Sequence, residues 1–480
     1  MRRRFRLDWA LLPEGWARDV IVTVSPAGTI EAVTVTVAVA AAAAGRAEAD
    51  AERTDTDAER VAGYVVPGMP NAHSHAFQRA LAGRAEARAA ARDSFWTWRR
   101  AMYAIANQVD AADLRAIATL LFVEMLEAGY TSVAEFHYLH RTRDDESDFA
   151  PDATPATWEA IRSAARDAGI GLTLLPTLYQ AADFRGVPLR PDQRRFQTTT
   201  AQFLDAIERR LAADRAADSP TLRTGAAFHS LRAVSIETIR EATAQLRAQD
   251  PSLPIHIHVA EQGREVRACE RATGARPIEW LLRAGVVDDR WCLVHCTHAT
   301  RAELAAVAAV GATICVSIST EANLGDGFFD AVTFRGASGH LAIGSDSQST
   351  VDPAEELRWL EYQQRLRRRR RNVLATTAEP HVGTGLWRAA AHAGARALGQ
   401  AIGTLAVGRR ADWLALDPTH PALVGAAPAE ALDHVVFAGG RHAIRDVYVA
   451  GRRVVAAHRH PLRAAAEERY REVMGRLTAR

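Results

Sequence analysis

Short apolar runs alternate with longer amphipathic stretches through the middle of the 480-residue chain. The stretches 111–129 and 301–311 repeat apolar residues at the spacing of a helix. Eight short apolar runs are predicted to be strands: 64–72, 131–138, 171–179, 222–230, 254–261, 291–298, 312–319 and 340–347. Because strands that alternate with helices pair in parallel, eight such repeats predict a closed (β/α)₈ barrel.

The two ends of the chain follow a different pattern. Residues 19–37 alternate apolar and polar positions around a turn at 26–28, which predicts a β-hairpin. Near the other end, three short strands are expected at 411–418, 433–439 and 445–455. We expect the two ends to pair into one small β-sandwich beside the barrel. The predicted division is 1–66 for the N-terminal part of the sandwich, 67–400 for the catalytic barrel, and 401–480 for the C-terminal part with a terminal helix.

Nearly every predicted barrel strand ends in a polar residue. These residues are His73, His75, Glu135, His137, Tyr179, His229, His258, Glu261, His295 and Asp346. The C-terminal ends of the strands in such a barrel meet at one mouth, where active sites are built. The pattern therefore predicts an active site at this mouth.

A metal site accounts for the histidines. His73 and His75 are two positions apart on an extended segment, so their imidazoles project to the same side and can bind one ion. With His258 and Asp346 they form a set that suits Zn²⁺, and Fe²⁺ would accept the same ligands. This set leaves an open position for water.

Two other ligand choices are open at the sequence level. His256 has the same parity as His258, but His258 lies nearer the end of its strand and is followed by Glu261, so we prefer His258 and expect His256 in the barrel core. Cys292 and Cys296 are alternatives as thiolate ligands, although their spacing favours core positions.

Composition removes several classes of function. Hydrophobic residues make up 48% and charged residues 24%, with a net charge of +2, so nothing calls for nucleic acid or an anionic membrane as a partner. The arginine-rich run 365–372 is expected to be the solvated end of a helix. The chain contains no lysine, which excludes a Schiff base, a Walker phosphate site and a carbamate bridging two metals. A mononuclear site is therefore favoured.

Cellular location is inferred from cysteines and apolar runs. Cys269, Cys292, Cys296 and Cys315 lack the density of a disulfide scaffold and are expected to be reduced core thiols. Residues 1–16 lack the apolar stretch of a signal peptide, and the run 32–44 is shorter than the roughly 20 residues that span a bilayer. We expect a cytoplasmic protein, with 45–60 as a polar surface loop.

Several segments resemble a known superfamily. Residues 67–80, 256–261, 293–298 and 343–347 resemble the mononuclear deaminase branch of the amidohydrolase superfamily, and 403–418 resembles its β-sandwich. More narrowly, the chain resembles the formimidoylglutamate deiminase group at 94–103, 135–140, 228–234, 319–327 and 355–367. The resemblance implies hydrolysis of N-formimino-L-glutamate to N-formyl-L-glutamate and ammonia, a step of histidine degradation.

The resemblance also implies roles for individual residues. His73, His75, His258 and Asp346 would hold one divalent metal ion. Glu261 and His295, together with Asp346, would move protons around a metal-bound water. The residues implied to bind the substrate are Gln78, Arg99, Tyr138, His229 and Arg232.

The partner that the resemblance implies is a small dicarboxylate substrate. Arg99 and Arg232 suit such a substrate, because arginine binds carboxylates in a bidentate fashion. The tryptophans of 94–100 are expected to brace the loop that carries Arg99. The sequence departs from the family at Gln348, where histidine is more usual.

We expect a homodimer. The alternatives are a related deaminase that acts on a purine or pyrimidine ring and a non-catalytic barrel scaffold.

Overall fold

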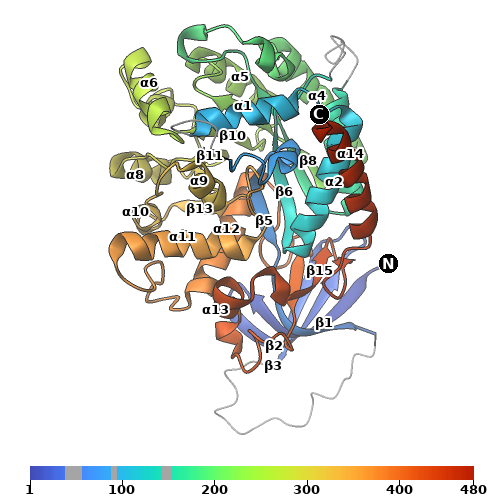
Figure 1. The fold of residues 1–480 in the computed structure, drawn as a ribbon. Coiled ribbons are helices and arrows are strands. Elements are labelled where there is room, and N and C mark those ends of the chain that lie inside the picture. Colours follow the sequence, from blue (N-terminus) through green and yellow to red (C-terminus); the bar gives the residue numbers. More distant parts are fainter. Residues whose placement is uncertain (38–56, 88–93, 143–153, 480) are drawn as a thin grey trace.

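The computed structural model describes residues 1–37, 57–87, 94–142 and 154–479, and within them the predicted barrel and a separate sheet are both present (Figure 1). Eight parallel strands pair in chain order. They are β5 (Met69–Ser74), β6 (Tyr130–His137), β7 (Gly171–Leu178), β9 (Ala226–Ser230), β10 (Ile255–Val259), β11 (Trp291–His295), β12 (Thr313–Val316) and β13 (His340–Ile343). The short strand β8 (Leu222–Thr224) pairs with β7.

Helices surround this barrel and include both predicted ones. The predicted stretches 111–129 and 301–311 form α2 (Ala111–Glu127) and α8 (Arg301–Ala309). The others are α3 (Ala156–Ala168), α4 (Thr200–Ala217), α5 (Ile236–Gln249), α6 (Gly263–Thr273), α7 (Pro277–Arg283), α9 (Ile318–Leu324), α10 (Ala331–Gly336), α11 (Pro353–Arg368) and α12 (Val382–Leu398). Helix α1 (Phe95–Ala106) lies over the end of the barrel that is farther from the second sheet (Figure 1).

Strands from both ends of the chain build the second sheet. Its order is β16 (Arg452–Val455), β15 (Ile444–Val449), β14 (Trp413–Leu416), β4 (Glu59–Pro67), β1 (Arg3–Leu12), β2 (Gly15–Val24) and β3 (Ile30–Val37). The predicted hairpin is confirmed as β2 and β3. The sheet has its own small core, in which the rings of Phe5 and Trp413 meet edge to face at 5.0 Å and Trp413 stacks on Tyr448 at 5.2 Å.

Four predictions about strands are wrong, and two of them, 222–230 and 445–455, each contain two strands, β8 with β9 and β15 with β16. The predicted strand 433–439 is helical: α13 (Ala431–His434) continues into a π-helical turn, Val435–Gly439. Both edges of β14 are already paired, with β4 and β15, so no edge beside it is free for another strand. The predicted strand 64–72 is two strands, because the chain passes from one sheet to the other at Gly68, where a side chain would collide with Thr131.

The barrel closes through a few backbone hydrogen bonds and side-chain contacts rather than a full ladder between its first and last strands: the Ser345 and Asp346 amides donate to the His73 carbonyl, and the His75 amide donates to the Asp346 carbonyl. One bridge pairs Ser74 with Asp346, and the Asn71 side chain both donates to Ser345 Oγ, at 2.7 Å, and accepts from the Ser345 amide, at 3.1 Å. Gly344 allows the approach, since a side chain there would lie 2.8 Å from the Cβ of His73. We call this contact between β5 and the end of β13 the closing seam.

Other predictions concern the surface and the thiols. The four cysteines are free and buried, as expected. Residues 366–372 are exposed at and beyond the end of α11, as predicted for a solvated helix end. The predicted loop 45–60 lies largely outside the described residues, and Glu59 and Arg60 belong to β4.

Helix α14 (Arg463–Thr478) ends the chain and packs on α2. None of the helices in the described ranges combines the length and apolar character needed to cross a lipid bilayer.

Candidate metal centre and active site

The four predicted metal ligands meet at the barrel mouth. His73 lies in β5, His75 follows the last residue of that strand, His258 lies in β10, and Asp346 follows β13 across the closing seam. The Nε2 atoms of His73 and His75 each lie 3.4 Å from Asp346 Oδ1, and those of His73 and His258 are 3.1 Å apart. Tetrahedral ligands at about 2.0–2.1 Å from one ion lie roughly 3.3–3.4 Å from each other, so the observed spacing fits one metal ion.

Backbone carbonyls hold two of these imidazoles in the orientation that a metal requires. The Nδ1–H of His75 donates to the carbonyl of Phe136 at 2.7 Å, and that of His258 donates to the carbonyl of His229 at 2.9 Å. Each bond leaves the Nε2 lone pair directed at the shared point. Burial lowers the pKa of His258 and His75, and it lowers that of His73 to about 3. Neutral imidazoles are the form that binds metal.

Asp346 supplies the negative charge of the group. Burial opposes its ionisation, but hydrogen bonding to His73 and the neighbouring imidazoles outweigh burial and lower the pKa of the carboxyl. Three neutral imidazoles and an ionised carboxylate are a donor set typical of Zn²⁺ or Fe²⁺. Among the described residues, no cysteine belongs to a group of side chains spaced to hold a metal, so the thiolate alternative has no structural support.

The fifth-strand alternative, His256, lies elsewhere. Its Nε2 is 2.8 Å from the carbonyl of Ala397, near the C-terminal end of α12, and the side chain is fully buried. This end of α12 also accepts a hydrogen bond from the Thr173 hydroxyl at 2.8 Å. His256 therefore faces the barrel interior away from the ligand group.

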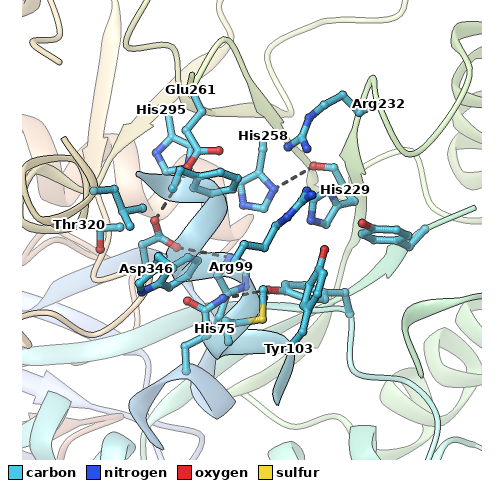
Figure 2. A pocket seen from close by; sticks show the side chains of 17 residues that line it. His75, Arg99, Tyr103, His229, Arg232, His258, Glu261, His295, Thr320 and Asp346 are labelled. Carbon is cyan, nitrogen blue, oxygen red and sulfur yellow. Dashed lines mark hydrogen bonds and ion pairs between the residues drawn. The ribbon is translucent and has the colours of Figure 1, made fainter. Parts of the chain in front are cut away.

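Glu261 and His295 lie beside the ligand group, as Figure 2 shows. The Nε2 of His295 is 3.9 Å from Glu261 Oε1 and 3.8 Å from Asp346 Oδ2. Burial raises the pKa of Glu261 to about 7. Burial acts against the charged form of His295, but Glu261, Glu321 and Asp346 together raise its pKa to about 10. The cluster therefore has groups that can hold and exchange a proton beside the metal position.

All five residues implied to bind substrate line the same pocket as the ligands. Arg99 and Arg232 point into this pocket toward the side that holds His229 (Figure 2). The Gln78 amide donates to the Tyr138 hydroxyl at 2.8 Å. In the part of the chain that the structure describes, neither arginine forms an ion pair with a carboxylate. The pocket therefore offers two cations without a carboxylate partner among the described residues.

An indole ring organises these cations. The guanidinium carbon of Arg99 lies 4.5 Å from the Trp96 ring centre, that of Arg232 lies 5.6 Å away, and that of Arg264 lies 4.4 Å away. Burial and the charge of Arg232 lower the pKa of Arg99. The segment around Arg99, predicted as a loop, is helix α1, and the bracing role of its tryptophans stays a prediction. The Trp96 ring stabilises three nearby positive charges.

Gln348 has a structural explanation. Its amide donates to the Asp346 carbonyl at 2.7 Å and to the Ser74 hydroxyl at 3.1 Å, so it ties the two sides of the closing seam together. Of the other predicted strand-end residues, Tyr179 lines the pocket, whereas Glu135 accepts the Ala76 amide at 2.6 Å behind the ligand group. His137 does not line the pocket.

Several residues of the site were not predicted. They are Phe95, Trp98, Met102, Tyr103, Thr320 and Leu324 in the pocket wall, and Glu321, which contacts His295. Glu321 follows β12 directly within the segment 319–327, so its place after a barrel strand was a usable indication.

Comparison with known proteins agrees with this geometry. Residues 64–454 match the amidohydrolase family, and the chain belongs to that family. It is 47% identical to the formimidoylglutamate deiminase of Pseudomonas aeruginosa over 98% of both chains. A crystal structure of an amidohydrolase from Brucella melitensis superposes with a TM-score of 0.87 and 38% identity, covering 99% of this chain and 100% of that one. A 5-methylthioadenosine/S-adenosylhomocysteine deaminase of Halobacterium salinarum is 27% identical over 86% of this chain and 87% of the relative.

Proposed function

We propose that the protein hydrolyses N-formimino-L-glutamate to N-formyl-L-glutamate and ammonia, as a step of histidine degradation. The observation that carries this proposal is the pair Arg99 and Arg232, which lack carboxylate partners among the described residues and share a pocket with the ligand group. The identity of 47% with a formimidoylglutamate deiminase supports it. The enzyme is a hydrolase that acts on a carbon–nitrogen bond.

The substrate fits the pocket by charge. A glutamate derivative carries two carboxylates, and guanidinium groups bind carboxylates through paired N–H donors. We assign the carboxylates to Arg99 and Arg232, with Gln78, Tyr138 and His229 lining the space between them and the ligand group. This placement directs the formimino carbon toward Asp346 and His295.

His73, His75, His258 and Asp346 would hold a divalent ion, which would supply Lewis acidity and bring the pKa of water to near 7. The residues around it handle protons. Asp346 is placed to accept the proton that water loses as its oxygen attacks the formimino carbon, and His295 is placed beside it to stabilise the charge that develops on that oxygen. Glu261, with its pKa raised to about 7, is placed to deliver a proton to the departing nitrogen. The hydroxyl of the resulting tetrahedral intermediate gives up the second proton of the water, which Asp346 is placed to pass to the same nitrogen, and cleavage of the carbon–nitrogen bond then releases ammonia and leaves the formyl group.

Three finer properties belong to the same proposal. Zinc is proposed as the metal because three imidazoles and a carboxylate are typical zinc ligands, and elemental analysis distinguishes it from iron. We propose a cytoplasmic location, which the four free thiols support. A homodimer is proposed, and light scattering of the purified protein tests it.

The decisive experiment measures ammonia release from N-formimino-L-glutamate, with and without a chelator. We expect turnover that the chelator abolishes and that added Zn²⁺ restores. Guanine, cytosine and 5-methylthioadenosine serve as competing substrates, because the aromatic side chains Phe95, Trp98 and Tyr103 of the pocket could also face a ring. Faster turnover of any of these rings than of the formimino compound would replace the proposal with a ring deaminase.

A further inference from the structure

Glu321 is a buried carboxylate that contacts His295 from behind. It lies in α9, directly after β12, and is fully buried. Its Oε1 is 3.3 Å from the Nδ1 of His295. The other ring nitrogen, Nε2, faces Glu261 and Asp346. His295 therefore lies between a carboxylate outside the pocket and the carboxylates that line it.

The local fold keeps Glu321 in place. The same Oε1 accepts the Ser317 amide at 3.1 Å, which ties the carboxylate to the turn where β12 ends and α9 begins. Its Oε2 is buried and has no hydrogen-bond partner among the described residues. A buried carboxylate with an unsatisfied oxygen carries a free-energy cost, so its retention beside His295 calls for a function.

We propose that Glu321 is a positioning residue for His295 in the hydrolysis assigned above, and the inference rests on that proposed function. By accepting a hydrogen bond from the Nδ1–H of His295, Glu321 fixes the ring orientation that directs Nε2 at Glu261 and Asp346. A carboxylate behind a histidine has this effect in other hydrolytic sites.

A second buried glutamate offers a matched control. Glu356 of α11 is also fully buried, and its Oε2 accepts the Ser319 amide at the start of α9 at 3.2 Å. Its Oε1 accepts the Ser319 hydroxyl. Glu356 thus supports the same helix as Glu321, but it is not among the residues that line the pocket. If α9 merely needs a buried carboxylate, both glutamates should matter equally.

The test compares Glu321→Gln, Glu321→Asp and Glu356→Gln, each in the wild-type and the His295→Asn background. We expect Glu321→Gln to lower kcat by about 10- to 100-fold, with KM and metal content unchanged. Glu321→Asp keeps the charge and should recover part of that loss, and Glu356→Gln should stay within about twofold of wild type. In the His295→Asn background, Glu321→Gln should cause no further loss, because the group it positions is gone.

Several outcomes would overturn the inference. One is wild-type kcat in Glu321→Gln. Another is a double variant, Glu321→Gln with His295→Asn, in which Glu321→Gln lowers kcat by the same factor as it does in the wild-type background. A third is a similar loss of metal or of melting temperature in both Glu321→Gln and Glu356→Gln, which would mark a structural role. A wild-type protein that deaminates only a ring substrate would contradict the proposed function instead. The same variants, measured with that ring substrate, would still decide the role of Glu321. A protein inactive on every substrate overturns both.

Discussion

At the scale of single residues, the site depends on backbone conformations that side chains usually avoid. His295, Asp346 and Gln348 have φ values of 72°, 46° and 65°, and Ala260, between His258 and Glu261, has φ 53°. Non-glycine residues adopt this left-handed conformation at a cost in free energy, and such residues are concentrated at functional sites. Here the turn at each strand end allows His258 and Glu261, three positions apart, to reach the same pocket.

The ligand assignment predicts opposite results for two neighbouring histidines. His258→Ala should remove an imidazole of the ligand group and abolish both bound metal and activity. His256→Ala removes a ring that contacts Ala397 in the barrel interior and should retain the metal. Elemental analysis and ammonia release measure both effects.

The pair also tests the number of metal ions. One ion per chain is expected for the wild-type protein and for His256→Ala. Two ions per chain, or loss of metal only in His256→Ala, would contradict the ligand assignment.

The unpaired arginines predict a change in specificity. Arg99→Met or Arg232→Met should lower kcat/KM for N-formimino-L-glutamate by about 30- to 1000-fold, since a lost carboxylate contact in a desolvated site costs about 2–4 kcal/mol. Metal content should not change. The measurement compares the full substrate with an analogue that lacks one carboxylate, which each variant should discriminate less well than wild type.

Arg100 is the matched control for these variants. It is exposed on the same helix and does not line the pocket, so Arg100→Met should keep wild-type kinetics. A wild-type enzyme that turns over the monocarboxylate equally well would show that the arginines bind something else.

The residues proposed to bind the metal could be predicted from the sequence, whereas the residues that contact and orient the side chains of the site could not. His73, His75, His258 and Asp346 could be located because parallel strands bring their C-terminal ends together whatever the loops do. Glu321 and Trp96 contact residues distant in the chain, and only the packing of α9 and α1 determines those contacts. No periodic pattern encodes that packing.

At the scale of elements, the attachment of α9 to α11 predicts a pH-dependent stability. Burial raises the pKa of Glu356, which links these helices, to about 8. Between about pH 5 and pH 8 the folded chain therefore holds a proton that the unfolded chain releases, and the stability due to this group falls as the pH rises. Glu356→Gln removes the effect. Its melting temperature should equal that of wild type near pH 5 and exceed it near pH 8.

Melting curves at both pH values test this expectation, with Glu468→Gln as a control on the exposed face of α14. The control should show the same difference from wild type at both pH values. A Glu356→Gln variant that is less stable than wild type at pH 8 would mean that the ionised carboxylate is needed to hold α9.

The elements themselves were predictable where the hydrophobic period was clear. The barrel strands and α2 follow their patterns closely. Strand β1 was not predicted, because its buried residues Phe5 and Leu7 stand singly beside exposed arginines rather than in an apolar run. The 433–439 error has another cause, since Val435 and Val436 are adjacent buried residues on a helical turn and a short apolar run fits either structure.

At the scale of the whole molecule, one guanidinium joins the barrel to the second sheet. Arg410 is buried and pairs with Asp412, at 2.6 Å, just before β14. It also donates to Ser132 of β6 and, at 2.9 Å, to the carbonyl of Pro220. Arg410→Met should lower the free energy of unfolding by about 3–5 kcal/mol, because Asp412 is left charged and buried.

Urea unfolding measures this loss, and a double variant separates its causes. Arg410→Met with Asp412→Asn should recover part of the stability, since the unpaired charge is gone. A single variant within about 1 kcal/mol of wild type would show that the two parts hold together without this pair.

The closing seam has a consequence for synthesis of the chain. His73 and His75 leave the ribosome early, whereas Asp346, their partner across the seam, follows about 270 residues later, which takes roughly 15–55 s at typical translation rates. The edge of β4 that pairs with β14 stays unpaired even longer, since β14 begins at Trp413. Until then the nascent chain carries two unpaired strand edges, which are sites of aggregation. Truncated translation products should therefore be insoluble rather than partly active, because the barrel closes only once Asp346 has been made and the second sheet is completed only once β14 to β16 have been made.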